Sequence, residues 1–281
     1  MFDTIFEELV KRSEEGITPE ADDYVIDGLL YCHKCNTKKQ CRIEVFGKEL
    51  KPMCLCKCEQ ERIDAEKAEA EKRAFNERVK KLRKMGFPSS EMQGWVFDRD
   101  DGENPKIGRL CRKYVENWET MKKDGKGLLF YGDVGTGKTF FAACIANALI
   151  DKGIPCLVTN FSRLINTVSG MYDGKQEYID GLNRFQLLVI DDLASERDTE
   201  FANELVFSII DARYRAGLPL IVTTNLTNEQ LKHPDTEAKN RVFSRLFEMC
   251  LPFNVTGKDR RKAKLRQDYE GYKELLGVEE D

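Results

Sequence analysis

The chain beyond residue 88 alternates short apolar runs with longer amphipathic stretches. Apolar residues in those stretches recur every three or four positions, which is typical of helices that bury one face. Continuous apolar runs of strand length between helices indicate βαβ units and a parallel sheet covered on both faces, an α/β fold. The pattern predicts strands at 128–131, 155–159, 187–190 and 220–224, and helices near 138–152, 161–171 and 199–216.

The first part of the chain has a different pattern. It opens with apolar residues at helical spacing, which predicts a short amphipathic helix. From Glu59 to Lys84 the chain is dense in Glu, Lys, Arg and Ala, which predicts an exposed helix with charge pairs one turn apart. A Met-Gly-Phe-Pro sequence at 85–88 ends that helix. The apolar residues of the opening stripe are Phe2, Ile5, Phe6, Leu9 and Val10.

Length and pattern together predict two domains. The chain has 281 residues, and the break near residue 86 divides it into an N-terminal domain with its linker helix (1–85) and a larger domain (86–281). The 45 basic and 49 acidic residues exclude a globally basic nucleic-acid binder, although a local basic patch is compatible with them. The first ten residues carry three acids, and no run reaches the roughly 18 apolar residues of a membrane span. We therefore expect a soluble, cytoplasmic protein with no membrane partner.

Six of the ten cysteines fall within residues 32–58, which favours a metal site over disulfides. The Cys-x-x-Cys pair of Cys32 and Cys35 is a zinc half-site, because two thiolates three positions apart on a turn can both reach a tetrahedral ion. The other half of the site has four candidate thiols for two positions, namely Cys41 and the alternating Cys54, Cys56 and Cys58. We predict that Cys56 and Cys58 complete the site, with Cys54 as the alternate. Four thiolates leave no open coordination position, so the Zn²⁺ is expected to be structural.

A glycine-rich sequence follows the first predicted strand and opens a helix. It fits the phosphate-binding pattern G-x-x-x-x-G-K-[ST] in the context that the pattern requires. Backbone amides of such a loop surround phosphate oxygens, and the following helix adds its positive dipole end. Lys138 is expected to contact the β- and γ-phosphates, and the Thr139 hydroxyl to ligate Mg²⁺. The residues are Gly132, Asp133, Val134, Gly135, Thr136, Gly137, Lys138 and Thr139.

Polar residues follow two later strands, where they would reach the same edge of the sheet. The run 187–190 ends in Asp191 and Asp192, and the run 220–224 ends in Asn225. We expect Asp191 to hold Mg²⁺, mainly through water, and Asp192 to orient and polarise the attacking water. Asn225 would lie near the γ-phosphate and help to place that water, although Asn is also common after strands.

Two arginine-containing stretches are further candidates. Arg241 and Arg245 share one face of a predicted helix, and P-loop ATPases often need an arginine from a neighbouring subunit to neutralise transition-state charge. This need makes Arg245 a candidate, while surface arginines commonly serve solubility alone. A later basic block could contact nucleotide phosphate or nucleic acid, or form a solvated helix start. Its residues are Lys258, Arg260, Arg261, Lys262, Lys264 and Arg266.

The order of these motifs resembles the AAA+ ATPases of the DnaC/DnaI helicase-loader group, with the transposition ATPase IstB as close kin. The resemblance covers roughly residues 90–260. It implies a P-loop NTPase with an αβα AAA+ core, in which ATP and Mg²⁺ bind at Lys138, Thr139 and Asp191. It rests on GDVGTGKT at 132–139, LLVIDDLASE at 187–196, IVTTN at 221–225, RVFSRLFEMC at 241–250 and GKDRR at 257–261.

The resemblance also implies roles for four polar residues. Asp192 takes the hydrolytic acid role, Asn225 is sensor 1, Arg245 is similar to the arginine finger and Arg261 falls where the family has a sensor-like arginine. Most AAA+ proteins carry Asp-Glu where this chain has Asp-Asp, so slow turnover is expected. Only 36 residues follow Arg245, too few for the usual AAA+ lid, which argues against an unfoldase or protease ring.

We expect an ATP-dependent loader. Its zinc-binding N-terminal domain would bind a replicative hexameric helicase, and its ATPase domains would self-associate. Single-stranded DNA would contact the ATPase domain, where Tyr172, Thr199 and Phe201 are candidates, although Phe201 could equally be core. The main alternative is an IstB-like transposition ATPase that binds target DNA. Two other functions are less well supported. A small-molecule P-loop kinase would need a substrate lid after the core, and the sequence shows none. A zinc-binding adaptor with an inactive ATPase domain would not hydrolyse ATP.

Overall fold

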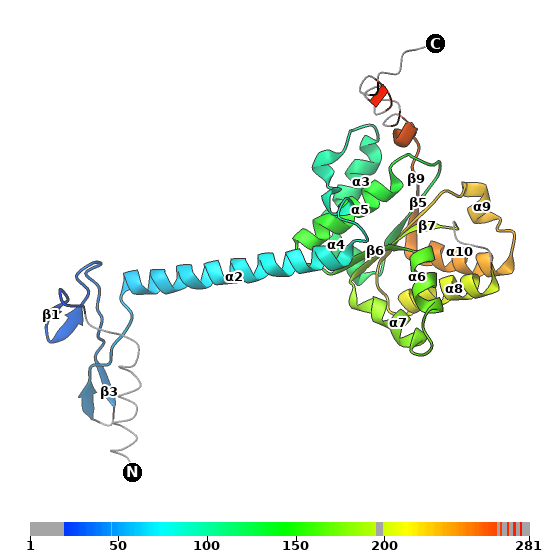
Figure 1. The fold of residues 1–281 in the computed structure, drawn as a ribbon. Helices are drawn as coiled ribbons and strands as arrows, with labels where there is room; N and C mark the ends of the chain where they lie inside the picture. Colours follow the sequence, from blue (N-terminus) through cyan, green and yellow to red (C-terminus); the bar gives the residue numbers. More distant parts are fainter. Residues whose placement is uncertain are drawn as a thin grey trace. The chain divides into compact units, whose positions relative to one another are not determined.

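The computed structural model describes residues 20–45, 47–194 and 199–262, together with residues 265, 269, 272, 273 and 276. The chain divides into two compact units, Met1–Asn76 and Glu77–Asp281 (Figure 1). The predicted apolar stripe between Phe2 and Val10 lies outside the described residues. Among the residues that are described, no helix is long and apolar enough to cross a membrane.

Ahead of residue 57, the described part of the first unit contains two short antiparallel hairpins. Strands β1 (Tyr24–Ile26) and β2 (Leu29–Tyr31) form one, and β3 (Ile43–Val45) and β4 (Lys48–Leu50) form the other. Asp27 and Gly28 both have positive φ between β1 and β2, as a two-residue hairpin turn requires. Strands of three residues leave almost no periodicity to read, so the sequence pattern did not predict these hairpins.

Helix α2 (Lys57–Gly86) confirms the predicted charged helix. Its exposed face carries ion pairs one turn apart, such as those of Arg62 with Glu59 and with Glu66, each at 2.6 Å. The last turns are different, because Leu82 packs with Phe87 in the core of the second unit. This packing explains why the division into compact units falls inside α2, ahead of the break predicted from the sequence.

The second unit contains a five-stranded parallel sheet in the order β6-β7-β8-β5-β9. Its strands are β5 (Gly127–Tyr131), β6 (Cys156–Asn160), β7 (Leu187–Leu193), β8 (Leu220–Thr224) and β9 (Cys250–Asn254). The first four confirm the predicted strands. Strand β9 was not predicted, because Pro252 argues against a strand, and it forms the edge, where a missing backbone N–H is tolerated.

Both faces of the sheet are covered by helices, as the continuous apolar runs predict. Successive residues of β5 alternate between two cores, with Leu128 and Phe130 in one and Leu129 in the other. The first core includes α3 (Pro105–Glu116), α4 (Trp118–Lys123) and α5 (Lys138–Asp151). The second includes α6 (Phe161–Ser169), α7 (Lys175–Gly181), α8 (Glu200–Arg215), α9 (Asn228–Lys232) and α10 (Glu237–Met249).

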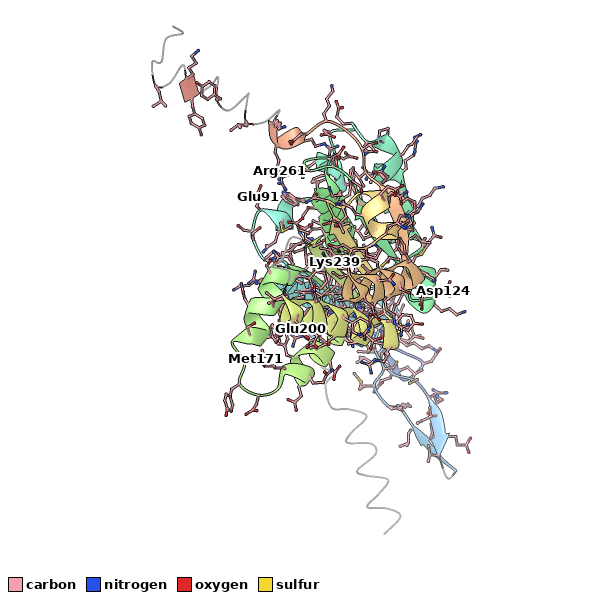
Figure 2. All side chains as sticks on the ribbon, turned by 90° about the vertical axis from the view of Figure 1, so that its right-hand side faces the viewer. Glu91, Asp124, Met171, Glu200, Lys239 and Arg261 are labelled. Carbon is pink, nitrogen blue, oxygen red and sulfur yellow. The ribbon has the colours of Figure 1, made fainter. Side chains whose placement is uncertain are left out.

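Figure 2 looks onto the face formed by α8 and α10, on which Glu200 and Lys239 lie. Beneath this face, Arg213 of α8 is only 1% exposed and anchors the amino ends of two strands. Its guanidinium donates to the carbonyls of Phe185 (2.8 Å) and Gln186 (2.7 Å) before β7. It also donates to the carbonyl of Pro219 (2.8 Å) before β8. Burial lowers the pKa of Arg213 to about 10, so the side chain remains charged at neutral pH.

Candidate functional site

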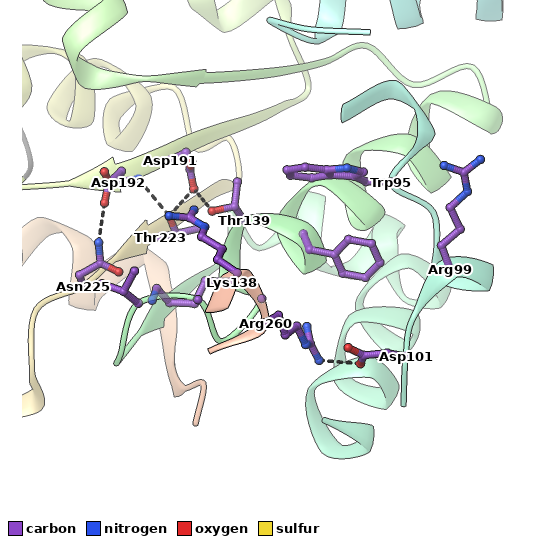
Figure 3. A pocket seen from close by; sticks show the side chains of 15 residues that line it. Trp95, Arg99, Asp101, Lys138, Thr139, Asp191, Asp192, Thr223, Asn225 and Arg260 are labelled. Atoms are coloured by element: carbon purple, nitrogen blue, oxygen red, sulfur yellow. Dashed lines mark hydrogen bonds and ion pairs between the residues drawn. The ribbon is translucent and has the colours of Figure 1, made fainter. Parts of the chain in front are cut away.

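A pocket of about 380 Å³ lies at the carboxyl ends of β5, β7 and β8 (Figure 3). Ligands of open parallel sheets bind at this edge, and the volume falls within the range of small-molecule sites. The lining residues are Trp95, Arg99, Asp101, Val134, Gly135, Gly137, Lys138, Thr139, Phe140, Asp191, Asp192, Thr223, Asn225, Arg260 and Arg261. The structure therefore brings five residues of the predicted loop together with the two acids, the amide and Arg261. The other three loop residues, Gly132, Asp133 and Thr136, do not line the pocket.

The glycine-rich loop connects β5 to α5 and curls around the side chain of Lys138. Gly137 has a φ of 96°, and a Cβ there would collide with the guanidinium of Arg260. Lys138 Nζ donates to the carbonyl of Gly132 at 2.8 Å and to that of Asp133 at 2.6 Å. Burial lowers the pKa of Lys138, and the nearby carboxylates of Asp192, Asp191 and Asp133 oppose that shift. Two carbonyls of the loop thus hold the ammonium group of Lys138 at the pocket.

Asp191 is joined to the glycine-rich loop by a direct hydrogen bond. Its Oδ1 accepts from the Thr139 hydroxyl at 2.7 Å and from the Thr223 hydroxyl at 2.5 Å. Burial raises the pKa of Asp191, and these two hydrogen bonds offset part of that rise because they favour the charged form. A hydroxyl and a carboxylate at this spacing are oxygen ligands of the kind that Mg²⁺ prefers, so the residues present fit the predicted ion.

A β-bulge lets both acids reach the pocket. Successive side chains of a regular strand point to opposite faces, so adjacent acids would be separated. The pairing of β7 with β8 shifts register between Ile190 and Leu193, and Asp192 has a φ of 62°. This bulge re-aims the Asp192 side chain into the pocket, where its Oδ1 accepts a hydrogen bond from Asn225 Nδ2 at 2.8 Å. Asn225 and Asp192 therefore act as one polar unit beside Asp191.

The opposite wall of the pocket was not predicted from the sequence. Trp95 and Arg99 lie across from Asp192 and Asn225 (Figure 3). The rings of Trp95 and Phe140 are 6.2 Å apart between centroids, which gives this wall an aromatic surface. Trp95 and Arg99 precede the glycine-rich loop in the sequence and belong to none of the predicted motifs. No signal in the sequence marks them, because only the fold brings them to that loop.

An ion pair joins two distant segments at the same wall. Arg260 Nη2 lies 2.8 Å from Asp101 Oδ1, and the backbone N–H of Arg260 donates to the carbonyl of Gly135 at 3.0 Å. The segment that carries Arg260 and Arg261 therefore lies against the glycine-rich loop. The sequence flagged this basic block and singled out Arg261, but the contact of Arg260 with the loop could not be read from it.

Arg245 does not line the pocket of its own chain. Its guanidinium lies 4.3 Å from the centroid of the Tyr214 ring, with Asp211 and Glu248 each at 3.5 Å. Arg241 has a similar arrangement over the ring of Phe207, at 4.1 Å. The side chain of Arg245 is 36% exposed, so a role in the pocket of a neighbouring copy stays a prediction.

The three residues proposed to face single-stranded DNA have different environments. Tyr172 is 97% exposed. Thr199 caps α8, because its hydroxyl accepts the backbone N–H of Ala202 at 3.2 Å. Phe201 is 43% exposed with Lys175 Nζ 5.6 Å from its ring centroid, so it is not a core residue. None of these contacts tests DNA binding, which stays a prediction.

Four cysteine thiols of the first unit converge. The Sγ atoms of Cys32, Cys35, Cys56 and Cys58 all lie within 4.8 Å of one another. Tetrahedral zinc with Zn–S bonds of ~2.3 Å requires sulfurs about 3.8 Å apart. The distances of 3.6 Å from Cys32 to Cys58 and 3.4 Å from Cys56 to Cys58 are close to that value, so the donor set fits zinc. Cys54 stands outside this group, with its thiol directed to the Lys38 carbonyl at 3.6 Å.

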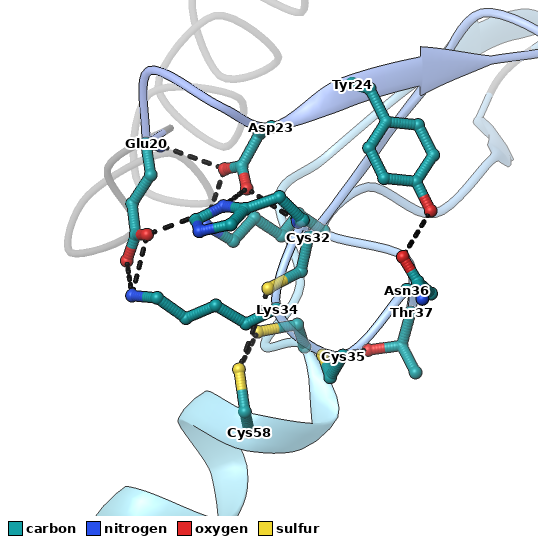
Figure 4. Close-up of polar contacts among 12 residues, drawn as sticks. Glu20, Asp23, Tyr24, Cys32, Lys34, Cys35, Asn36, Thr37 and Cys58 are labelled. Carbon is teal, nitrogen blue, oxygen red and sulfur yellow. Dashed lines mark hydrogen bonds and ion pairs between the residues drawn. The ribbon is translucent and has the colours of Figure 1, made fainter.

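Charged residues brace the loop that carries the first two cysteines (Figure 4). The side chain of Asp23 is almost fully buried, and its carboxylate lies 2.6 Å from Lys39 Nζ. The backbone N–H of His33 donates to the same carboxylate at 3.2 Å. The hydrogen bond from Lys39 holds the pKa of Asp23 well below its usual range. Lys34 pairs with Glu20 at 2.8 Å, so both residues between the cysteines are tied to neighbouring acids.

Comparison with known proteins gives a consistent set of matches. The sequence model of the IstB-like ATP binding protein family matches residues 62–268. The replicative helicase loader DnaI of Bacillus subtilis is 23% identical over 194 residues, covering 64% of this chain and 62% of that protein. The replicative helicase loader DnaC of Escherichia coli K12 is 25% identical over 127 residues, covering 43% of this chain and 50% of that protein. The chain thus spans between half and two thirds of the length of these relatives.

Solved structures show the same fold at low identity. The crystal structure of DnaI has a TM-score of 0.52 at 23% identity, covering 61% of this chain and 96% of that chain. The DnaC helicase loader has a TM-score of 0.50 at 24% identity, covering 60% and 100%. The replication initiator DnaA bound to AMPPCP and single-stranded DNA has a TM-score of 0.50 at 18% identity, covering 69% and 66%. The second unit therefore has the AAA+ P-loop fold that the motifs predict.

Proposed function

Since the chain belongs to the IstB-like ATP-binding protein family, we propose that it is an ATP-dependent loader that helps to place a replicative helicase on single-stranded DNA. The main support for the proposal is that the residues of the pocket and the matched relatives point to the same function. The pocket holds the phosphate loop, two acids and an amide, and the matched relatives include the helicase loaders DnaI and DnaC.

The pocket residues have the chemistry that ATP hydrolysis needs. Lys138 and the backbone amides of the loop would bind the phosphates, and Thr139 and Asp191 would hold Mg²⁺. The ion, when bound, neutralises charge on the β- and γ-phosphates. Asp192, held by Asn225, would orient and polarise the water, while Trp95 and Phe140 offer an aromatic surface to the base. Hydrolysis would be completed by Arg245 of a neighbouring copy, so the rate depends on self-association.

The first unit would supply the helicase contact. We assign its four cysteines to a structural zinc ion, which leaves no open position for catalysis. The ATP-bound and ADP-bound states would differ in their affinity for helicase and DNA, so hydrolysis would change how tightly the loader binds both. Slow turnover is compatible with this role, because the difference in binding energy between the ATP and ADP states, and not the rate of hydrolysis, changes the affinity of the loader.

A second function has specific support. A putative insertion sequence ATP-binding protein of Sinorhizobium fredii is 27% identical over 143 residues, covering 49% of this chain. A transposition ATPase of that kind would bind target duplex DNA without a helicase.

The two functions predict different results in two parallel experiments, one with circular single-stranded DNA and one in which duplex DNA replaces it. The chain is mixed with ATP, the hexameric replicative helicase of the same genome and circular single-stranded DNA, and helicase retained on the DNA is measured after gel filtration. A loader increases the retained helicase in an ATP-dependent way, and the Lys138→Ala variant does not. An ATP-dependent filament on duplex DNA, with no effect on the helicase, would favour the transposition function instead.

A further inference from the structure

Thr223 lies between the two acids of the pocket, although its position inside a strand gives no sign of a role there. It belongs to β8 and is 2% exposed. Its hydroxyl donates to Asp191 Oδ1 at 2.5 Å and accepts the backbone N–H of Asp192 at 2.9 Å. One side chain therefore contacts both acidic residues, one through the carboxylate and one through the backbone.

The β-bulge explains why this contact matters. Ile190 pairs with Val222 and Leu193 pairs with Thr224, so Asp191 and Asp192 together face the single residue Thr223. A bulge leaves an extra residue outside the regular ladder of hydrogen bonds. The hydroxyl of Thr223 supplies a partner for the displaced N–H of Asp192, whose φ of 62° is unusual for a residue other than glycine.

The same hydroxyl also fixes the carboxylate that would hold Mg²⁺. Asp191 Oδ1 accepts from Thr139 on one side and from Thr223 on the other. Both donors bind the same oxygen, so the carboxylate is oriented by two elements far apart in the sequence and neither hydroxyl occupies Oδ2. Partners of this kind behind a metal ligand commonly change metal affinity or activity by about 10–100-fold when removed.

We propose that Thr223 is a positioning residue that holds Asp191 in place for Mg²⁺ and holds the bulged backbone of Asp192 in place for the attacking water. The inference rests on the proposed ATP site and is independent of whether the protein binds a helicase. It assigns the effect to the hydroxyl group rather than to the volume of the side chain.

Three variants of the full chain separate the hydroxyl from the packing. Thr223→Val keeps the shape and loses the hydroxyl, whereas Thr223→Ser keeps the hydroxyl and loses a methyl group. Thr224→Val is the matched control, because Thr224 is equally buried in the same strand and its hydroxyl donates to the backbone carbonyl of Leu193. Thermal unfolding checks that each variant is folded, and Thr223→Ala replaces Thr223→Val in the comparison if the latter is not.

The measurement is the rate of ATP hydrolysis as a function of Mg²⁺ concentration. Thr223→Val is expected to raise the half-saturating Mg²⁺ concentration by about 10–100-fold and to lower the rate at saturation, with Thr223→Ser within about 3-fold of the parent. Thr224→Val is expected to keep the Mg²⁺ dependence of the parent even where it lowers thermal stability. An unchanged Mg²⁺ dependence in Thr223→Val, or the same shift in Thr224→Val, would overturn the inference.

The outcome remains distinguishable from failure of the proposed function. Mg²⁺-dependent binding of a fluorescent ATP analogue is measured for every variant beside the rate, with the same expected shift, and it stands alone if the parent hydrolyses no ATP. Binding by the parent that does not depend on Mg²⁺ contradicts the inference, and absence of any nucleotide binding contradicts the proposed ATPase as well. Failure to bind a helicase, with the Thr223 shift present, contradicts the loader function alone.

Discussion

Replacing single cysteines should distinguish a zinc ligand from a cysteine that does not bind the ion. In Cys56→Ser the site loses one of its four sulfurs, whereas Cys54→Ser changes a thiol that lies outside the group. The two positions are two residues apart, so the pair is a matched comparison. It also tests the alternate ligand that the sequence left open.

The few buried apolar side chains of this unit imply that a bound metal would dominate its stability. Among the described residues ahead of α2, the buried apolar side chains are those of Leu29, Cys32 and Cys56. Burying one leucine contributes about 2 kcal/mol, whereas a structural zinc site contributes about 10–16 kcal/mol. If each thiolate carries roughly a quarter of that energy, Cys56→Ser loses about 3 kcal/mol, or on the order of 100-fold in zinc affinity.

Zinc affinity can be measured by competition with a chromophoric chelator, and folding of the unit by limited proteolysis of the full chain. The parent and Cys54→Ser should hold one zinc ion per chain and resist cleavage between residues 20 and 56. Cys56→Ser should release zinc to the chelator and be cut there. Loss of zinc from Cys54→Ser with retention in Cys56→Ser would refute the assignment of ligands, and a parent without zinc would refute the metal itself.

Four further predictions concern the second unit. Lys138→Ala should weaken ATP binding at least about 10-fold because the phosphates lose their point charge, as measured by quenching of Trp95 fluorescence. Asp192→Asn should lower the hydrolysis rate by about 100-fold while ATP binding changes little, and equal losses of both would contradict a role in water activation. Arg245→Ala should be inactive alone yet recover part of the rate when mixed with Lys138→Ala, since each copy then supplies what the other lacks; no recovery would argue against action between copies. Arg213→Met should lower the free energy of unfolding in urea by about 3 kcal/mol, because the carbonyls before β7 lose their donors, and a change under about 1 kcal/mol would contradict that account.

Much of the ATP site could be predicted because its signals are local. The glycine-rich loop carries its own spacing, and the two acids and the amide each follow an apolar run of strand length. The order of these motifs then placed them at one edge of a parallel sheet. The pocket lining confirms that these residues meet there, while their roles in catalysis stay predictions.

The parts of the site that sequence could not supply depend on tertiary structure. Thr223 gains its contacts from a register shift between two strands, which no local pattern records. Trp95 and Arg99 reach the pocket because the segment before α3 packs on α5, where Asn147 Nδ2 donates to the carbonyls of Met92 and Trp95. Strand β9 was missed because its proline argues against a strand anywhere except at an edge.

The four thiols that converge are the four that the sequence favoured, and Cys54 lies outside the group. The spacing favoured Cys56 and Cys58 over Cys54 only weakly, because an extended segment points all three thiols to one side. In the structure α2 begins at Lys57, so Cys58 lies in its first turn and the alternation stops before it. The start of the helix thus separates the thiols that converge from that of Cys54, and a hydrogen bond from the Lys57 backbone N–H to the Thr37 hydroxyl, at 2.9 Å, stabilises that start.

Native mass spectrometry of the chain mixed with the hexameric replicative helicase of the same genome tests the loader function most directly. With ATP present, the account predicts a complex of the helicase hexamer with one or more copies of this chain, each carrying one zinc ion. The complex should lose copies when ATP is replaced by ADP. A helicase that remains free of this chain in every nucleotide state, while the chain itself is folded and binds ATP, would contradict the central claim.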